Sequence, residues 1–282
     1  MSTGNNILNR LFTQSIFTRL IDSQTEPTYY AVVKKYTEAP ESKCNDELIR
    51  EIYNLMGKTY RNEYFYKNTI LNKLLLGRHS PATTTALAEV PVAKSKADFI
   101  LINGKAIVYE IKTELDSFER LENQIFDYYK AFEHVCVVTC ESNYRSIEKR
   151  LKDSPVGICL LTKRNTLCTR KEPIADRTNL DLTVMFKILR KKEYESVLKS
   201  YYGELPRVTQ FNYFSACMNM FAEMGSERAY ESFLMELKKR NKIGATEYAT
   251  VPYELKYLSY FAAERKNYYP KLNAFLHSKF GG

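Results

Sequence analysis

The sequence lacks a long apolar run, contains few histidines and has no closely paired cysteines. No stretch approaches the roughly 20 apolar residues that a membrane-spanning helix needs. Residues 1–21 show neither an apolar core nor a small-residue cleavage site. Three histidines and six scattered cysteines occur, without a CxxC pair, so neither zinc binding nor a disulfide framework is well supported. We therefore expect a cytoplasmic protein with no membrane segment.

Acidic residues are outnumbered by basic ones. The 282 residues include 42 Lys and Arg against 33 Asp and Glu, a formal net charge of +9. A basic surplus fits a polyanionic partner such as nucleic acid, although a surplus of this size is common and decides little alone. The charged and apolar fractions, 27% and 44%, are ordinary for a globular chain and do not indicate wholesale disorder.

The apolar pattern divides the chain into three predicted parts. Residues 1–44 form an N-terminal helical extension, with a helix over 5–21 and an irregular segment after it. Residues 45–174 alternate helices and strands, which predicts an α/β core with a mixed sheet covered by helices on both faces. Residues 175–282 show helical stretches and form a helical C-terminal region. In the core, we expect helices at 45–56, 62–76, 116–133 and 143–152, and strands at 84–92, 97–102, 105–112, 134–139 and 156–161.

One predicted hairpin carries the residues with the clearest chemistry. Asp98 lies on the strand before the Asn103-Gly104 turn, and Glu110 and Lys112 lie on the strand after it. Carboxylates hold hard cations such as Mg²⁺ through oxygen, and the cation offsets charge on a phosphate in the transition state. A nearby lysine can position the attacking water. The hairpin therefore predicts a magnesium- or manganese-dependent phosphodiester hydrolase.

The register of this hairpin decides whether the carboxylates meet. A two-residue Asn103-Gly104 loop would pair 102 with 105, and therefore Asp98 with Tyr109 rather than Glu110. A three-residue loop or a β-bulge would bring Asp98 opposite Glu110, and a glycine in a left-handed conformation suits such an irregularity. We therefore expect an irregular hairpin, or an Asp98 that leaves the strand to turn inward.

The surroundings of these charges separate two interpretations. Charged residues on a half-exposed sheet can be solvated and without function. Here, however, both faces of the two strands are apolar, with Phe99, Leu101 and Ile111 on one side and Ile100, Ile102 and Val108 on the other. Unpaired buried charge is costly, so charges kept between such faces favour a ligand.

The same residues resemble the signature of the PD-(D/E)XK nuclease superfamily, whose fold is restriction-endonuclease-like. Asp98 and Glu110-Ile111-Lys112 match its strands, and Gln124 and Tyr128 match the Gln-x-x-x-Tyr element of the following helix. Ala97 replaces the usual proline. With Tyr109, Asp116 and Arg120-Leu121, the set more closely resembles a family of small stand-alone bacterial nuclease-like proteins. The resemblance covers about residues 45–162.

The resemblance implies roles for individual residues. Asp98, Glu110 and Glu89 would coordinate Mg²⁺ or Mn²⁺ with the Ile111 carbonyl, and Lys112 would orient the water or stabilise the phosphate. An acidic residue of the first core helix, Glu47 or else Glu51, belongs to the pattern. Gln124, Tyr128 and Arg120 would position substrate or brace the site. Asp116 could equally cap a helix, and Arg120 could equally pair with a site carboxylate.

The function expected from this resemblance is cleavage of nucleic acid, DNA in preference to RNA, in defence against foreign DNA or in its processing. Two alternatives stay open: a module that binds nucleic acid or protein without cutting, and a nuclease that is silent until a partner engages the C-terminal helices. Those helices could also form a homodimer. Their tyrosines and basic residues suit either nucleic-acid binding or packing, and helical spacing favours packing.

Overall fold

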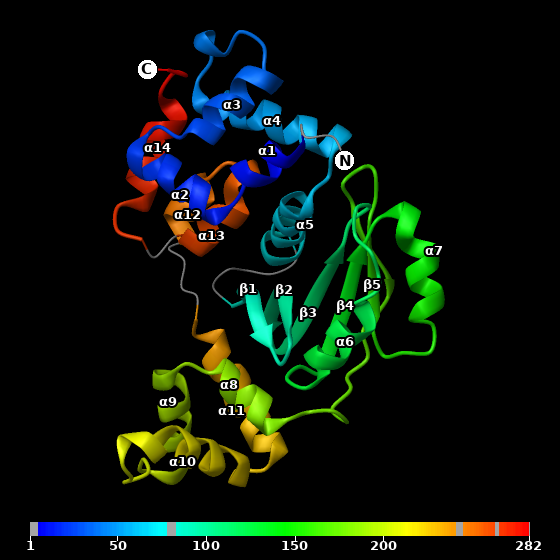
Figure 1. Cartoon of the computed structure of the whole chain (residues 1–282), viewed down its shortest axis with the longest axis vertical. Coiled ribbons are helices and arrows are strands. Elements are labelled where there is room, and N and C mark those ends of the chain that lie inside the picture. The colour runs from blue at the N-terminus through cyan, green and yellow to red at the C-terminus, as the bar shows by residue number, and fades with distance from the viewer. Residues whose placement is uncertain (1–4, 78–82, 241–244, 263–264, 282) are drawn as a thin grey trace. The chain divides into compact units, whose positions relative to one another are not determined.

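The computed structural model describes residues 5–77, 83–240, 245–262 and 265–281, and the chain divides into two compact units. The first, here called the helical unit, joins Met1–Ala82 to Ile243–Gly282. The second, the sheet unit, is the continuous segment Thr83–Lys242 (Figure 1). This division differs from the predicted boundaries after residues 44 and 174, because the helices over 45–76 belong with the two ends of the chain.

The helical unit is built from short helices at both ends of the sequence: α1 (Asn5–Leu11), α2 (Gln14–Ser23), α3 (Pro27–Tyr36), η1 (Pro40–Ser42), α4 (Asn45–Thr59), α5 (Glu63–Ile70), the π-helical η2 (Leu71–Leu76), α12 (Ala245–Thr250), η3 (Tyr253–Leu255), α13 (Lys256–Ala262) and α14 (Tyr268–His277). Buried polar contacts join the two ends. The Asn45 side chain donates to the Phe275 carbonyl at 3.0 Å and accepts from the Tyr29 hydroxyl at 2.6 Å.

Two predictions for the N-terminal segment were wrong. The single helix expected over 5–21 is split into α1 and α2, because the Thr13 hydroxyl caps the second helix at the Ile16 N–H. The irregular segment expected after it contains the helix α3. Pro27 occupies its first turn, where no N–H is needed, and the Glu26 carboxylate accepts from the Thr28 and Tyr29 N–H groups.

The sheet unit contains a six-stranded mixed sheet in the order β1-β2-β3-β4-β5-β6. The neighbours β1–β2, β2–β3 and β5–β6 are antiparallel, whereas β3–β4 and β4–β5 are parallel. The strands are β1 (Thr85–Val92), β2 (Ser95–Asn103), β3 (Lys105–Lys112), β4 (His134–Thr139), β5 (Gly157–Leu161) and β6 (Leu167–Lys171). The strand β6 was not predicted. The other five lie where the alternation of apolar residues placed them.

Helices of the sheet unit share a continuous apolar core with one face of this sheet. They are α6 (Leu121–Tyr129), α7 (Glu141–Arg150), α8 (Leu182–Ile188), α9 (Lys191–Tyr202), α10 (Gln210–Glu223) and α11 (Ser226–Lys238). Ile100 and Val108 of the sheet belong to the same buried cluster as Tyr128 of α6, Phe186 of α8 and Phe233 of α11. The predicted α/β class, with a mixed sheet and C-terminal helices, is therefore confirmed. Tyr194 and Tyr230 of those helices are buried in this cluster.

Within the parts of the chain that the structure describes, every helix is too short or too polar to cross a bilayer.

Candidate functional site

Three acidic residues lie in line across the first three strands of the sheet. The pairs Ala88–Phe99 and Val90–Ala97 place Glu89 of β1 opposite Asp98 of β2. The pairs between β2 and β3 run from Asn103–Lys105 to Phe99–Tyr109. One position further in the same register, Asp98 lies opposite Glu110 of β3. Residues directly opposite one another in antiparallel strands share a face, so the register gathers all three carboxylates on one face.

The expected irregularity of the hairpin is confirmed. Asn103 pairs with Lys105, so the turn is centred on Gly104 alone, which adopts a φ of 72°. This left-handed conformation carries little steric strain for glycine, which has no Cβ, and more for other residues. Compared with a two-residue loop, the turn shifts the register by one position, and that shift aligns Asp98 with Glu110.

Glu110 lies at the centre of a buried polar network. Its Oε1 accepts hydrogen bonds from Lys112 Nζ at 2.8 Å and from Gln124 Nε2 at 2.6 Å, and its Oε2 lies 2.6 Å from the Tyr128 hydroxyl. Lys112 Nζ also donates to Gln124 Oε1 at 2.9 Å. Glu110 and Lys112 are 1% and 7% exposed. Burying either charge alone would be costly, so each makes the burial of the other tolerable.

Tyr128 holds its proton in this setting. Burial raises the pKa of its hydroxyl well above the usual value, and the neighbouring Glu110 carboxylate raises it further. The neutral hydroxyl can therefore keep donating to Glu110. The main-chain carbonyl of Lys96 lies 2.9 Å from the same hydroxyl, so one proton is shared between two acceptors.

Asp98 and Glu89 form the more open part of the site. Asp98 Oδ2 accepts a hydrogen bond from the Ile111 N–H at 2.8 Å, which fixes its carboxylate against β3. Glu89 forms an ion pair with Lys96 and has a φ of 54°. Carboxylate oxygens of Glu89 and Asp98 lie within 4.8 Å of one another.

This donor set fits a hard divalent cation. Two oxygen ligands on opposite sides of Mg²⁺ stand about 4.2 Å apart, so a small movement of either side chain would let Glu89 and Asp98 share one ion. Glu110 is held differently, since both of its oxygens already accept hydrogen bonds from side chains. A carboxylate has about four lone-pair positions, so Glu110 can still offer one to a ligand.

The helix α6 contributes a row of residues to this face. Arg120 precedes its first turn, and Gln124 and Tyr128 follow at intervals of four, as expected. The prediction that Asp116 caps this helix was wrong, because the helix begins at Leu121. The Asp116 carboxylate instead accepts from the backbone N–H and the hydroxyl of Thr113, both at 2.8 Å, and so stabilises the turn that follows β3.

Glu47 lies in the helical unit, on α4. Its carboxylate accepts a hydrogen bond from the Cys44 N–H at 2.8 Å in a capping box. Glu51, the other candidate on this helix, pairs with Lys43 at 2.8 Å. Both carboxylates therefore have contacts within the helical unit.

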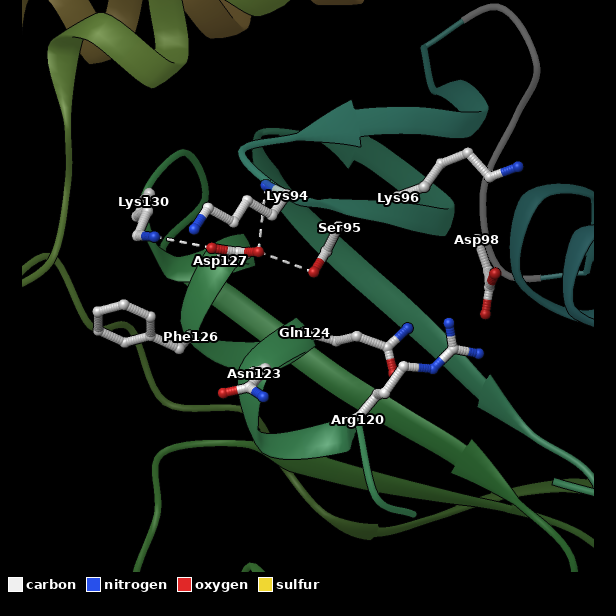
Figure 2. Close-up of a pocket in the computed structure, with 10 residues that line it drawn as sticks. All are labelled: Lys94, Ser95, Lys96, Asp98, Arg120, Asn123, Gln124, Phe126, Asp127 and Lys130. Atoms are coloured by element: carbon white, nitrogen blue, oxygen red, sulfur yellow. Dashed lines mark hydrogen bonds and ion pairs between the residues drawn. The ribbon is translucent and has the colours of Figure 1, made fainter. Parts of the chain in front are cut away.

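An open pocket of about 760 Å³ adjoins the carboxylates (Figure 2). Asp98, Arg120 and Gln124 lie at one end of it in the view of Figure 2, and the side chains of Lys94, Phe126 and Lys130 lie toward the other. Several residues of its lining were not predicted as site residues from the sequence, namely Lys94, Lys96, Asn123, Phe126, Asp127 and Lys130.

Asp127 anchors the far end of this pocket. It accepts hydrogen bonds from the Lys94 N–H at 3.2 Å, from the Ser95 hydroxyl at 2.8 Å and from Lys130 Nζ at 2.7 Å. Burial opposes its ionisation, but the hydrogen bonds from Lys130 and Ser95 outweigh that effect and lower the pKa of this carboxyl. The charged carboxylate thus ties the β1–β2 turn to the end of α6. Its spacing of three residues from Lys130 was a possible signal for this contact.

Comparisons with known proteins give one family and a distant relative. The family model described as bacteriophage P4 protein cII matches residues 56–251. Protein cII of Enterobacteria phage P4 is 27% identical over 143 residues, which is 49% of this chain and 50% of the phage protein. The chain thus spans about half the length of this curated relative. No solved structure matches.

Proposed function

Because the chain belongs to the family of bacteriophage P4 protein cII, a name that specifies no reaction, we propose its function from the geometry of its site: it is a divalent-metal-dependent nuclease. One observation carries the proposal. Glu89, Asp98 and Glu110 are aligned on one face across three adjacent strands, and Lys112 is held beside them. This juxtaposition is the one that the resemblance to PD-(D/E)XK nucleases requires.

The residues divide into those that hold a cation and those that support them. Asp98 and Glu89 would hold Mg²⁺ or Mn²⁺, with Glu110 and the Ile111 carbonyl as further ligands. When bound, the ion offsets charge on the phosphate and makes bound water more acidic. The left-handed φ of Glu89 supports this role, because such strain in a residue other than glycine persists where the structure requires it and is frequent at functional sites.

The remaining residues would act on the substrate and on the water. Lys112 is fixed by Glu110 and Gln124, so its ammonium group can orient a water molecule or neutralise a phosphate oxygen. Arg120 and Lys96 line the adjoining pocket, where they would bind the phosphates of the nucleic acid. Tyr128 keeps Glu110 in place by its hydrogen bond.

The proposal also covers the substrate, the cellular location and the process that the enzyme serves. We favour DNA over RNA, a cytoplasmic location, and a part in defence against foreign DNA or in its processing, all of which follow from the resemblance. The C-terminal helices would provide the contact for a homodimer or a partner protein.

A second candidate function is binding without cleavage. It is favoured by the engagement of Glu110, whose two oxygens already accept three hydrogen bonds and which could serve as a purely structural brace. In that case the pocket would bind nucleic acid, and no added metal would lead to hydrolysis. A nuclease that stays silent until a partner engages it would behave in the same way when alone.

The test is a cleavage assay with the full chain. Supercoiled plasmid, linear duplex, single-stranded DNA and RNA are incubated with Mg²⁺, with Mn²⁺ or with EDTA, beside Asp98→Asn and the exposed control Asp153→Asn. We expect cleavage that EDTA abolishes, a loss of at least about 100-fold in Asp98→Asn, and full activity in Asp153→Asn. The Asn amide oxygen can still accept from Ile111, so the first variant should fold.

Absence of cleavage in every arm, together with binding that weakens as salt rises, would replace the nuclease proposal with the binding module or the partner-gated enzyme. Cleavage that survives EDTA and the Asp98 substitution would point to a contaminating enzyme.

A further inference from the structure

An aromatic ring stands open to solvent in the lining of the pocket. Phe126 is 54% exposed, although it lies on α6 between buried Ile125 and Asp127. Lys130 Nζ stands 4.5 Å from the centroid of its ring. Figure 2 shows the ring on the side of the pocket away from Asp98. The ring is accessible and lies in the lining of the pocket beside a cation, so it offers a surface on which a flat ligand can stack.

Cations surround this ring and the rest of the pocket. Lys94, Lys96, Arg120 and Lys130 line it, against the carboxylates of Asp98 and Asp127. Asp127 already accepts three hydrogen bonds, and one of them comes from Lys130. With Glu89, which pairs with Lys96, the carboxylates at the pocket number three against four basic side chains, so the balance is still positive and suits a phosphate chain rather than an apolar peptide.

The pocket is also longer than one phosphate requires. At about 1.5 Å per helical residue, the stretch from Arg120 to Lys130 extends roughly 15 Å. A nucleic-acid strand rises about 3.4 Å per nucleotide in B-form geometry, so the same length accommodates several nucleotides. A strand whose cleaved phosphate lies at Asp98 would thus reach Phe126 within a few nucleotides.

We propose that Phe126, Lys94 and Lys130 form a subsite for an unpaired nucleotide that neighbours the cleaved bond, so that the substrate is single-stranded or locally unpaired nucleic acid. This inference rests on the proposed function and names its substrate class. The base stacks on the Phe126 ring, and the flanking phosphates contact the two ammonium groups. In a duplex the faces of each base are covered by its neighbours, so a protruding ring can stack only on a base that has left the helix.

The subsite is preorganised by the hydrogen bonds of Asp127. The bonds of Asp127 to the Lys94 N–H and to Ser95 fix the β1–β2 turn, and its bond to Lys130 fixes the end of α6. The backbone segments that carry the ring and the two lysines are therefore held together, and the Lys130 side chain is held as well. Little has to be ordered on binding, which favours affinity.

The experiment measures binding and cleavage separately. Labelled single-stranded DNA, single-stranded RNA and a blunt duplex of the same length are titrated with the full chain in EDTA, and the same molecules are then cleaved with Mg²⁺. The variants are Phe126→Ala, the conservative Phe126→Tyr, and Phe211→Ala as a matched control, because Phe211 is an exposed phenylalanine of the same unit on α10.

We expect the wild type to bind and cut single strands better than the duplex. Phe126→Ala should bind single strands about tenfold more weakly, within the range measured for the loss of one stacked base, whereas its weaker duplex binding should change little. Phe126→Tyr should restore affinity, and Phe211→Ala should leave it unchanged.

The outcomes separate the two proposals. If the wild type cuts nucleic acid but Phe126→Ala binds single strands as tightly as before, or loses duplex binding to the same extent, the subsite is wrong while the nuclease stands. If the wild type binds single strands in a manner that depends on Phe126 but cuts nothing, the subsite stands and the nuclease does not. If the wild type neither binds nor cuts, both proposals fall.

Discussion

The hydroxyl of Tyr128 lies 2.6 Å from Glu110 Oε2 and shares its single proton with the Lys96 carbonyl. This contact links the helix α6 to the strand that carries Glu110. The next residue, Tyr129, is also buried, but its hydroxyl has no hydrogen-bond partner among the described residues. Two adjacent buried tyrosines thus differ in whether the hydroxyl has a hydrogen-bond partner.

Tyr128→Phe should lower the free energy of unfolding by about 1.5–3 kcal/mol, the usual contribution of a hydrogen bond to a charged group. Tyr129→Phe should be neutral or slightly stabilising, because it removes an unsatisfied buried hydroxyl. Urea denaturation of both variants measures the difference. Equal midpoints for the two would mean that the Glu110 contact contributes nothing to stability.

Lys112→Met should be costlier, because it leaves the buried Glu110 carboxylate without its cation. We expect a loss of about 3–5 kcal/mol in the free energy of unfolding. The double variant Lys112→Met/Glu110→Gln should recover part of that loss, since the uncompensated charge is then gone. Arg150→Met removes an exposed ion pair with Glu122 and should cost less than about 1 kcal/mol. A Lys112→Met variant as stable as Arg150→Met would contradict this account.

Gly104→Ala tests the turn that aligns the carboxylates. A Cβ at this position would meet no atom within 4 Å, so the cost comes from the left-handed backbone alone, about 1–2 kcal/mol. Gly104→Asn should lose less, because asparagine tolerates this conformation better. Urea denaturation ranks the three proteins. An alanine variant equal to the wild type would show that the turn relaxes without penalty.

Stability should fall at alkaline pH in both units. Burial raises the pKa values of Tyr29, Tyr53 and Tyr64 in the helical unit, and of Tyr128 in the sheet unit, far above their usual value. The unfolded chain, with tyrosine pKa values of about 10, then loses protons first as the pH rises. The stabilisation is complete below about pH 10 and is lost above it, by about 1.4 kcal/mol per pH unit for each such tyrosine.

Urea midpoints measured from neutral to strongly alkaline pH, alongside the absorbance of tyrosinate, check this expectation. A midpoint that stays constant while tyrosinate forms would show that the ionising tyrosines are exposed ones.

The hairpin shows what local sequence can predict. Asn103-Gly104 indicated a turn, and the need to bring Asp98 and Glu110 to one face predicted the register shift that Gly104 produces. The row of Gln124 and Tyr128 followed from helical spacing. These features depend on neighbours in sequence or on the period of one helix or strand, and for that reason they could be predicted from the sequence.

Features that depend on distant partners were missed. The segment after residue 21 was predicted to be irregular, although Pro27 begins α3 and Glu26 caps that helix. The hydrogen bonds of Asp127 with Lys94 and Ser95 join residues more than 30 positions apart. No spacing pattern in the sequence predicts them. The membership of α4 in the helical unit depends on α14, whose Phe275 carbonyl lies 230 positions from Asn45.

The helical unit has a consequence for how the chain matures on the ribosome. Its two parts are separated by the whole sheet unit, and an isolated β-bridge joins Cys44, before α4, to Lys279, after α14. During vectorial synthesis, Thr83–Lys242 emerges as one contiguous piece and can fold while α4 still waits for α14. The helices α1 to α5 are thus made before the sheet unit but reach their partners in α12 to α14 only after it, and in the interval their apolar surfaces are open to proteases and chaperones.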